Sequence, residues 1–258
     1  MPGAWLILPT YNEAENIEAI VHAALEQLAL TGREHTVLIV DDGSPDGTGR
    51  LAHGLAERHP EVRVLHRTQK QGLGRAYLAG FEIALADGAE LVLEMDSDFS
   101  HDPADLPRLI APAVDGADLV LGSRYVPGGG VENWGLDRRV LSRLGCGYAR
   151  RTLGVPVRDL TGGFKCFRAS ALQAIAAETA TAQGYAFQVE LTYRVVSLGL
   201  TVVEVPIRFR ERRLGESKMS AQIALEAAWR VPALRYGPRR WRPLEADGLP
   251  ADPLTHEG

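Results

Sequence analysis

Short unbroken apolar runs alternate along the first half of the chain with longer segments whose apolar residues recur at helical spacing. Four such runs, each typical of a strand buried on both faces of a sheet, lie at residues 4–8, 36–40, 62–65 and 91–95. The first helical segment follows Asn12, which we expect to be its N-cap. Alternating strands and helices are typical of a parallel sheet with right-handed crossovers. The pattern therefore predicts an α/β fold.

The second half of the chain continues with fewer strands and longer helices. Strands are predicted at residues 118–121 and 201–209, and helices at about 136–153, 187–198 and 220–235. We expect one catalytic domain over residues 1–235. Residues 236–258 are polar and contain prolines, which predicts a disordered tail.

Polar residues stand where three of the predicted strands end. In an open parallel sheet these ends share one edge, where ligands bind. The sequence therefore predicts a binding site built from side chains that are far apart along the chain. The residues are Tyr11 and Glu13, Asp41 and Asp42, and Asp96 and Asp98.

The acidic pair at the end of the fourth strand is the strongest candidate for chemistry. Asp96 and Asp98 leave the strand as it curls, and Ser100 follows two residues later. Two carboxylates aimed at one point repel each other unless a hard cation such as Mg²⁺ or Mn²⁺ lies between them. The alternative is a solvated acidic turn before the helix that Pro103 opens. The pair alone does not decide between these interpretations.

A glycine pair opens the helix after the third strand. Gly72 and Gly74 suggest a dinucleotide-binding loop, but Tyr77 stands where its third glycine belongs. We therefore favour two glycines that ease the start of a helix.

Composition excludes several classes of protein. The 258 residues are 45% hydrophobic and 24% charged, which is ordinary for a soluble globular protein. No apolar run approaches the ~20 residues of a membrane span, and we expect no signal peptide. The two cysteines, Cys146 and Cys166, lack metal-ligand spacing and favour a reducing, cytoplasmic compartment. Nothing in the sequence indicates a nucleic-acid partner.

Charge is divided unevenly along the chain. Residues 1–123 carry 8 Lys and Arg against 20 Asp and Glu, whereas residues 124–258 carry 20 against 13. The basic half includes an amphipathic helix at 136–153, a cationic loop at 210–218, and Trp229 followed by a basic stretch at 239–242. Basic and aromatic residues together suit an anionic membrane surface. A core-packed helix with a solvated arginine face remains the alternative.

Seven motifs in order resemble glycosyltransferase family 2, and within it the polyprenol-phosphate (dolichol-phosphate) mannose synthases. The resemblance extends from about residue 4 to about residue 235. The motifs are PTYNE (9–13), VDDGSPDGT (40–48), GLGRAY (72–77), MDSD (95–98), GSRY (122–125), DLTGGF (159–164) and GESK (215–218).

The resemblance implies a GT-A fold, a nucleotide-sugar donor, a divalent metal and a role for each matching residue. The base and ribose of the donor would contact Pro9, Tyr11, Glu13, Val40 and Asp42. The metal and the diphosphate would contact Asp96, Ser97 and Asp98, with Ser100 as a further metal ligand. Asp98 would be catalytic, and the donor and acceptor phosphates would be handled by Arg124, Arg138, Arg212 and Lys218.

The resemblance also implies the reaction. Mannose would pass from GDP-mannose to a polyprenyl monophosphate with inversion, at the cytoplasmic face of a membrane. Some relatives carry C-terminal membrane spans that this chain lacks, which suggests a separate membrane-anchoring subunit. The alternatives are a UDP-glucose-dependent transferase acting on a polyprenyl phosphate or a polysaccharide, and a non-catalytic sugar-nucleotide or lipid-phosphate binding module.

Overall fold

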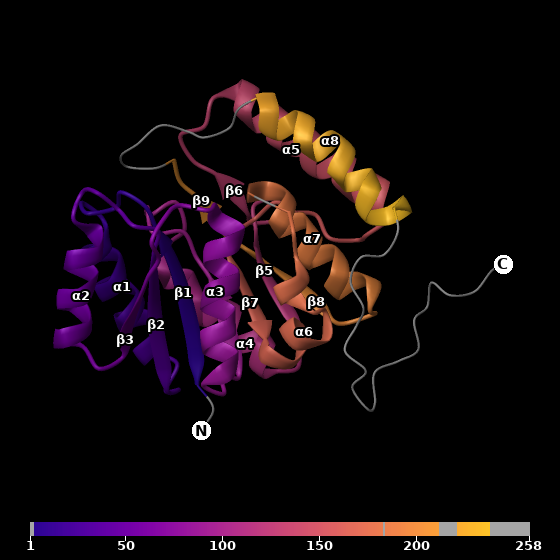
Figure 1. The fold of residues 1–258 in the computed structure, drawn as a ribbon. Helices are drawn as coiled ribbons and strands as arrows, with labels where there is room; N and C mark the ends of the chain where they lie inside the picture. The colour runs from indigo at the N-terminus through magenta and orange to yellow at the C-terminus, as the bar shows by residue number, and fades with distance from the viewer. Residues whose placement is uncertain (1–2, 183, 212–220, 238–258) are drawn as a thin grey trace.

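The computed structural model describes residues 3–182, 184–211 and 221–237, with side chains omitted at 221–228. A seven-stranded sheet forms its centre, in the order β3-β2-β1-β4-β7-β5-β8 (Figure 1). β7 runs antiparallel to both of its neighbours, and the other pairs are parallel. The strands are β1 (Ala4–Thr10), β2 (His35–Asp41), β3 (Val62–His66), β4 (Leu91–Glu94), β5 (Leu119–Ser123), β7 (Lys165–Arg168) and β8 (Val202–Pro206).

A second, two-stranded ladder and ten helical segments complete the described part of the chain. β6 (Gly130–Val131) pairs with β9 (Arg208–Phe209) in parallel. The first five helical segments are α1 (Ile17–Ala29), α2 (Thr48–Arg58), α3 (Leu73–Ala86), the 3₁₀ turn η1 (Pro103–Asp105) and α4 (Leu106–Val114). The other five are α5 (Leu136–Leu153), α6 (Ala169–Ala174), η2 (Ala177–Thr179), α7 (Gly184–Ser197) and α8 (Ala221–Tyr236).

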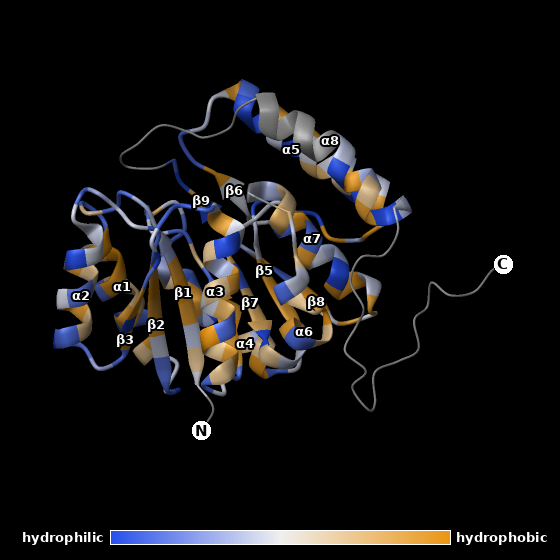
Figure 2. Cartoon of the chain, in the orientation of Figure 1, coloured by the Kyte–Doolittle hydropathy of each residue, from blue (hydrophilic) through white to orange (hydrophobic). Residues whose placement is uncertain are grey.

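Both faces of the sheet are covered, which gives three layers and confirms the predicted α/β architecture. Successive residues of β1 alternate between two buried clusters, with Leu6 and Leu8 on one face and Trp5 and Ile7 on the other. The strands are accordingly the most hydrophobic part of the molecule (Figure 2). The first cluster packs against α1, α2 and α4, and the second against α3 and α7. Each fully buried Leu or Ile contributes about 1.5–3 kcal/mol to folding.

The close approach of α3 to the sheet depends on a glycine. A Cβ atom at Gly80 would lie 2.4 Å from Cγ2 of Ile7 in β1, so any larger residue would force helix and strand apart. This contact places the first turn of α3, including Gly72 at its N-cap, beside the carboxyl end of β1.

Three local predictions are wrong in detail. α1 begins at Ile17 with Asn16 as its N-cap, because Asn12 has φ +60° and belongs to the turn after β1. The strand predicted at residues 201–209 is two strands, since Pro206 ends β8. The helix predicted from residue 187 begins at Gly184. The single domain over 1–235 and the disordered tail over 236–258 remain predictions, and residues 238–258 lie outside the described part.

Candidate active site

A pocket of about 350 Å³ lies at the carboxyl ends of β1 and β4, between the first turns of α3 and α7. The residues predicted at the strand ends line it with the exception of Asp41, and residues from the second half of the chain, which the strand ends did not predict, complete it. Most of the residues predicted to bind the donor belong to it. The lining is Pro9, Thr10, Tyr11, Glu13, Asp42, Lys70, Gly72, Leu73, Ala76, Asp96, Ser97, Asp98, Thr161, Gly163, Gly184, Tyr185 and Gln188.

One end of the pocket is formed by the loops after β1 and β2 and by Lys70. The ammonium group of Lys70 lies 3.8 Å from the centre of the Tyr11 ring. Asp42 accepts a hydrogen bond from Nη1 of Arg67 at 2.5 Å. Burial raises the pKa of Asp42, and the positive charge of Arg67 offsets part of that rise. This end offers an aromatic face and a carboxylate. The side chain of Val40 lies in the core instead, away from the lining.

The motif after β2 fixes the loop after β1 by hydrogen bonds to its backbone. Asn12 donates its N–H to Oγ of Ser44 at 3.0 Å, and Glu13 donates to Oγ1 of Thr48 at 2.9 Å. Asp46 in turn accepts hydrogen bonds from the N–H and the hydroxyl of Thr48. Much of the VDDGSPDGT motif therefore positions the neighbouring loop.

The acidic turn after β4 lies at the middle of the site. The Asp96 side chain is 28% exposed, whereas Asp98 is buried. Oδ1 of Asp98 accepts hydrogen bonds from the Ser100 N–H at 3.0 Å and hydroxyl at 2.5 Å, and Ser97 donates to the Pro9 carbonyl at 3.0 Å. Phe99 has φ +61°, which gives the sharp bend. The turn is internally braced, and the Ser100 hydroxyl predicted as a metal ligand is directed at Asp98.

His101 holds this turn by accepting a hydrogen bond from its backbone, a role that the sequence did not reveal. The Asp96 N–H donates to Nδ1 of His101 at 3.2 Å, and the ring packs against Phe164 and Phe209. Burial lowers the pKa of His101 to about 4, so the imidazole is neutral at pH 7 and can accept this bond.

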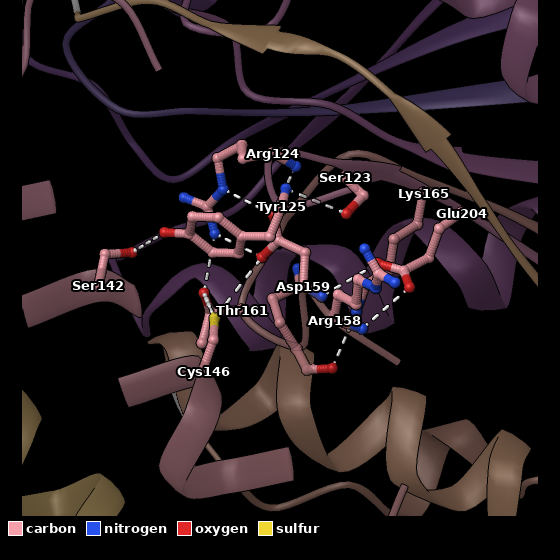
Figure 3. Close-up of polar contacts among 11 residues, drawn as sticks. Ser123, Arg124, Tyr125, Ser142, Cys146, Arg158, Asp159, Thr161, Lys165 and Glu204 are labelled. Atoms are coloured by element: carbon pink, nitrogen blue, oxygen red, sulfur yellow. Dashed lines mark hydrogen bonds and ion pairs between the residues drawn. The ribbon is translucent and has the colours of Figure 1, made fainter. Parts of the chain in front are cut away.

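Arg124 is buried in an ion pair with Asp159 (Figure 3). Nε and Nη2 of the guanidinium donate to the two carboxylate oxygens at 2.7 and 2.6 Å, and Nη2 also donates to Thr161 at 2.9 Å. Glu204 on β8 accepts the N–H groups of Arg158 and Asp159. The positive charge of Arg124 is thus committed to the loop that carries Thr161.

Arg138 is the remaining described cation among the predicted catalytic residues. Its Nη1 donates to Oε1 of Glu211 at 2.9 Å, and its guanidinium lies 4.1 Å from the centre of the Trp134 ring. This arrangement places Arg138 next to the start of the cationic loop. Arg212 and Lys218 lie outside the described residues.

Three buried polar residues that the sequence analysis did not single out lie together at the pocket. Glu94, Lys165 and Gln188 are all at most 2% exposed. Burial raises the pKa of Glu94 to about 7, with the charge of Lys165 offsetting part of the rise. Burial lowers the pKa of Lys165 to about 8, which Glu94 partly offsets. The sequence features that could have revealed this group are a lysine within an apolar strand and a glutamine within an apolar helix.

The site offers oxygen ligands from two neighbouring carboxylates, Asp96 and Asp98. Within residues 3–182, 184–211 and 221–237, no three His, Cys, Asp or Glu side chains gather as a metal cluster. Mg²⁺ commonly binds through one or two carboxylates together with substrate phosphates, so this donor set fits such an ion. The described helices include none that is long and apolar enough to cross a membrane.

Comparison with known proteins gives a consistent family. Residues 5–176 match the model described as "Glycosyl transferase family 2". The chain is 49% identical over 230 residues to polyprenol monophosphomannose synthase of Mycolicibacterium smegmatis, covering 88% of this chain and 84% of the relative. It is 48% identical over 241 residues to undecaprenyl-phosphate mannosyltransferase of Micrococcus luteus, covering 93% and 96%.

Among solved structures, glucosyl-3-phosphoglycerate synthase of Mycobacterium tuberculosis has a similar fold. The TM-score is 0.69 at 21% identity for its complex with phosphoglyceric acid, covering 93% of this chain and 82% of that one. A second structure of the same enzyme, in complex with Mn²⁺, UDP-glucose and phosphoglyceric acid, gives a TM-score of 0.66 and covers 91% and 79%. These likenesses confirm the GT-A architecture.

Proposed function

The chain belongs to glycosyltransferase family 2, and on that premise we propose that it transfers mannose from GDP-mannose to a polyprenyl monophosphate with inversion. The observation that carries the proposal is that Tyr11, Asp42, Asp96 and Asp98 line one pocket. The two relatives at 48–49% identity, named for mannosyl transfer to polyprenol or undecaprenyl phosphate, support the sugar and the acceptor. The guanine base rests on the motif resemblance.

A divalent metal ion, Mg²⁺ or Mn²⁺, would be held by Asp96 and Asp98. Both are hard oxygen ligands, and their mutual repulsion favours a cation between them. When bound, such an ion supplies positive charge to the leaving diphosphate. A distant relative crystallised with Mn²⁺ and UDP-glucose supports this class of ion.

In this reaction the residues of the chain bind and orient the two substrates and neutralise the charge of their phosphates. The phosphate of the acceptor is already anionic at neutral pH, so its oxygen can attack C1 of the sugar in line without a strong general base. The difficulty is to bring two polyanions together. Arg138, Arg212 and Lys218 would hold the phosphates, whereas Arg124, paired with Asp159, would position the loop that carries Thr161.

The acceptor lipid requires access to a bilayer, and α5 offers a surface for it. The exposed apolar side chains of α5 recur at helical spacing, and α8 lies alongside with exposed Trp229 and Tyr236 (Figures 1 and 2). Arg143, Arg150 and Arg151 are exposed on the same helix. Apolar and cationic side chains together fit an anionic lipid surface. The apolar residues of α5 are Leu136, Val140, Leu141, Leu144 and Tyr148.

The proposal places the protein at the cytoplasmic face of a membrane. A separate membrane-anchoring subunit would strengthen the attachment, because a peripheral helix pair alone binds reversibly.

A donor panel tests the function. Purified protein is incubated with a polyprenyl monophosphate, Mg²⁺ or Mn²⁺, and radiolabelled GDP-mannose, GDP-glucose or UDP-glucose, and lipid-linked product is extracted. We expect product chiefly from GDP-mannose. Preferential use of UDP-glucose would show a glucosyltransferase, and binding of a donor without turnover of any would show a binding module.

A further inference from the structure

The Gln188 carboxamide is a buried polar group at the wall of the pocket. Gln188 is 2% exposed and lines the pocket from α7. Within the described residues, neither Oε1 nor Nε2 makes a hydrogen bond of normal geometry. A weaker interaction of the amide with the Glu94 carboxyl, outside that geometry, offsets part of the rise that burial causes in the pKa of Glu94. A buried amide in this state is unfavourable unless a ligand completes it.

Gly163 keeps the space between Gln188 and the acidic turn open. A Cβ atom at Gly163 would lie 3.7 Å from Nε2 of Gln188 and 3.9 Å from Oδ1 of Asp96. A side chain there would therefore occupy the space that both polar groups border. A ligand atom in that space would meet an amide on one side and a carboxylate on the other.

Lys165 holds the backbone of Gln188 in place. Nζ of Lys165 donates to the Gln188 backbone carbonyl at 2.8 Å, and the Thr192 hydroxyl donates to the same oxygen at 2.9 Å. Lys165 lies opposite Glu94 in the β4–β7 ladder. Phe187, the preceding residue of α7, stacks on Tyr77 of α3 with ring centres 6.3 Å apart. The start of α7 is thereby tied to β7 and to α3.

The order of the strands assigns a part of the donor to each end of the pocket. β2 and β1 lie on one side of β4, and β7 lies on the other. Tyr11 and Lys70 border the β1 side, whereas Gln188 and Gly163 border the β7 side. With the diphosphate at the Asp96–Asp98 turn, a base stacked near Tyr11 leaves the β7 side to the sugar.

The Gln188 carboxamide can both donate and accept hydrogen bonds, as hydroxyl groups also can, so it suits a ligand with hydroxyl groups. A phosphate oxygen fits less well, because it only accepts hydrogen bonds and would leave the carbonyl oxygen of the amide without a donor. We propose that the Gln188 carboxamide binds hydroxyl groups of the transferred hexose and discriminates between sugar epimers, and that Lys165 and Glu94 are its positioning residues. The inference rests on the proposed function, because it takes the ligand to be a nucleotide sugar.

The test compares Gln188→Met, which keeps a similar volume without the amide, with wild type and with Gln173→Met at an exposed position of α6. Calorimetry with Mg²⁺ present gives Kd for GDP and for GDP-mannose, and kinetics give kcat/KM for GDP-mannose and GDP-glucose. In Gln188→Met we expect kcat/KM for GDP-mannose to fall about 10–100-fold and its ratio to the GDP-glucose value to fall as well. Kd for GDP should stay within about twofold, which also shows that the variant is folded.

Equal weakening of GDP and GDP-mannose would overturn the proposal, because Gln188 would then act on the nucleotide or on the fold. An unchanged ratio of the two kcat/KM values would overturn it too. Gln188→Glu provides a second variant, since its carboxylate accepts hydrogen bonds but does not donate them; we expect the same ratio to fall while GDP still binds.

The positioning role is tested with the double variant Glu94→Gln, Lys165→Met, because removing one partner alone would leave an unpaired buried charge. We expect the epimer ratio to fall while Kd for GDP is kept. A purely structural role would lower both kcat/KM values equally and contradict the assignment.

The failure of this inference is distinguishable from that of the proposed function. If wild type turns over another nucleotide sugar better than GDP-mannose, the proposed donor is wrong. The same comparison is then made with that donor, its epimer and its bare nucleoside diphosphate, and Gln188→Met is judged by the same ratio.

Discussion

Arg124 and Asp159 form a buried, two-point ion pair, although they lie 35 residues apart in sequence. Asp159 is fully buried and also accepts the backbone N–H of Arg124 at 2.9 Å. One carboxylate therefore holds both the side chain and the main chain at the end of β5. Figure 3 shows Thr161 and Cys146 beside this pair. The pair joins the loop after β5 to the Thr161–Gly163 wall of the pocket.

Removing one partner should destabilise the protein strongly. Asp159→Ala leaves the Arg124 charge buried without its partner, which we expect to lower the free energy of unfolding by about 3–5 kcal/mol. Urea denaturation followed by circular dichroism measures the loss. Glu26→Ala, at an exposed position on α1, is the control and should change stability by no more than about 0.5 kcal/mol. A loss of similar size in both variants would show that the pair does not stabilise the fold.

The same pair should give the protein an acid-sensitive component of stability. Burial alone would raise the pKa of Asp159, but the charge and hydrogen bonds of Arg124 more than offset it, so the pKa is lowered below its ordinary value. The contribution is then full above the unfolded pKa of about 4 and is lost as the pH falls through the lower folded value. Unfolding free energies measured from pH 5 to pH 2 should fall less steeply in Asp159→Asn than in wild type. Equal slopes would contradict this assignment.

Asp98→Asn should abolish turnover while the protein stays folded. The amide keeps the shape of the side chain but removes the charge that a metal ion needs, and we expect a loss of about 10²-fold or more in kcat. The control is Asp115→Asn, at an exposed position at the end of α4, which should turn over like wild type. Near wild-type activity in Asp98→Asn would remove the metal-site hypothesis.

Membrane binding should depend on the exposed apolar face of α5. Leu144 is 66% exposed there, and Leu144→Glu should reduce flotation with anionic liposomes. Wild-type binding should weaken with salt, because each basic residue near the surface contributes roughly 1 kcal/mol through screened electrostatics. Leu30→Glu changes a residue that is 74% exposed at the end of α1 and should bind like wild type. Equal losses in both variants would show that α5 is not the docking face.

The cationic loop should contribute mainly to turnover. Arg212→Ala and Lys218→Ala remove charges that the motif resemblance assigns to the phosphates, and each should raise the activation free energy by about 2–4 kcal/mol if the contact is strongest in the transition state. Steady-state kinetics with separate kcat and KM values measure this. Normal turnover in both variants would eliminate the loop from the mechanism.

Much of the fold and part of the site were readable from the sequence. Buried strands and helical stripes predicted the α/β order, because both faces of the sheet exclude water and only apolar residues satisfy them. Asp42, Asp96 and Asp98 could be placed at one edge, because the carboxyl ends of parallel strands coincide. Local turns were harder: Asn12 was predicted as the N-cap of the first helix, but its N–H and that of Glu13 donate to Ser44 and Thr48, which holds both residues in the turn before α1.

Only the tertiary structure decided which polar residues are buried at the pocket and which are already paired. Arg124 looked like a phosphate ligand, but Asp159 neutralises it, and no periodicity reveals an ion pair across 35 residues. Gln188 looked like one polar residue in a helix, yet the packing of α7 against β4 and β7 buries its amide at the pocket wall. Burial and hydrogen-bond geometry depend on elements brought together by folding, whereas strand and helix preferences depend on neighbours along the chain.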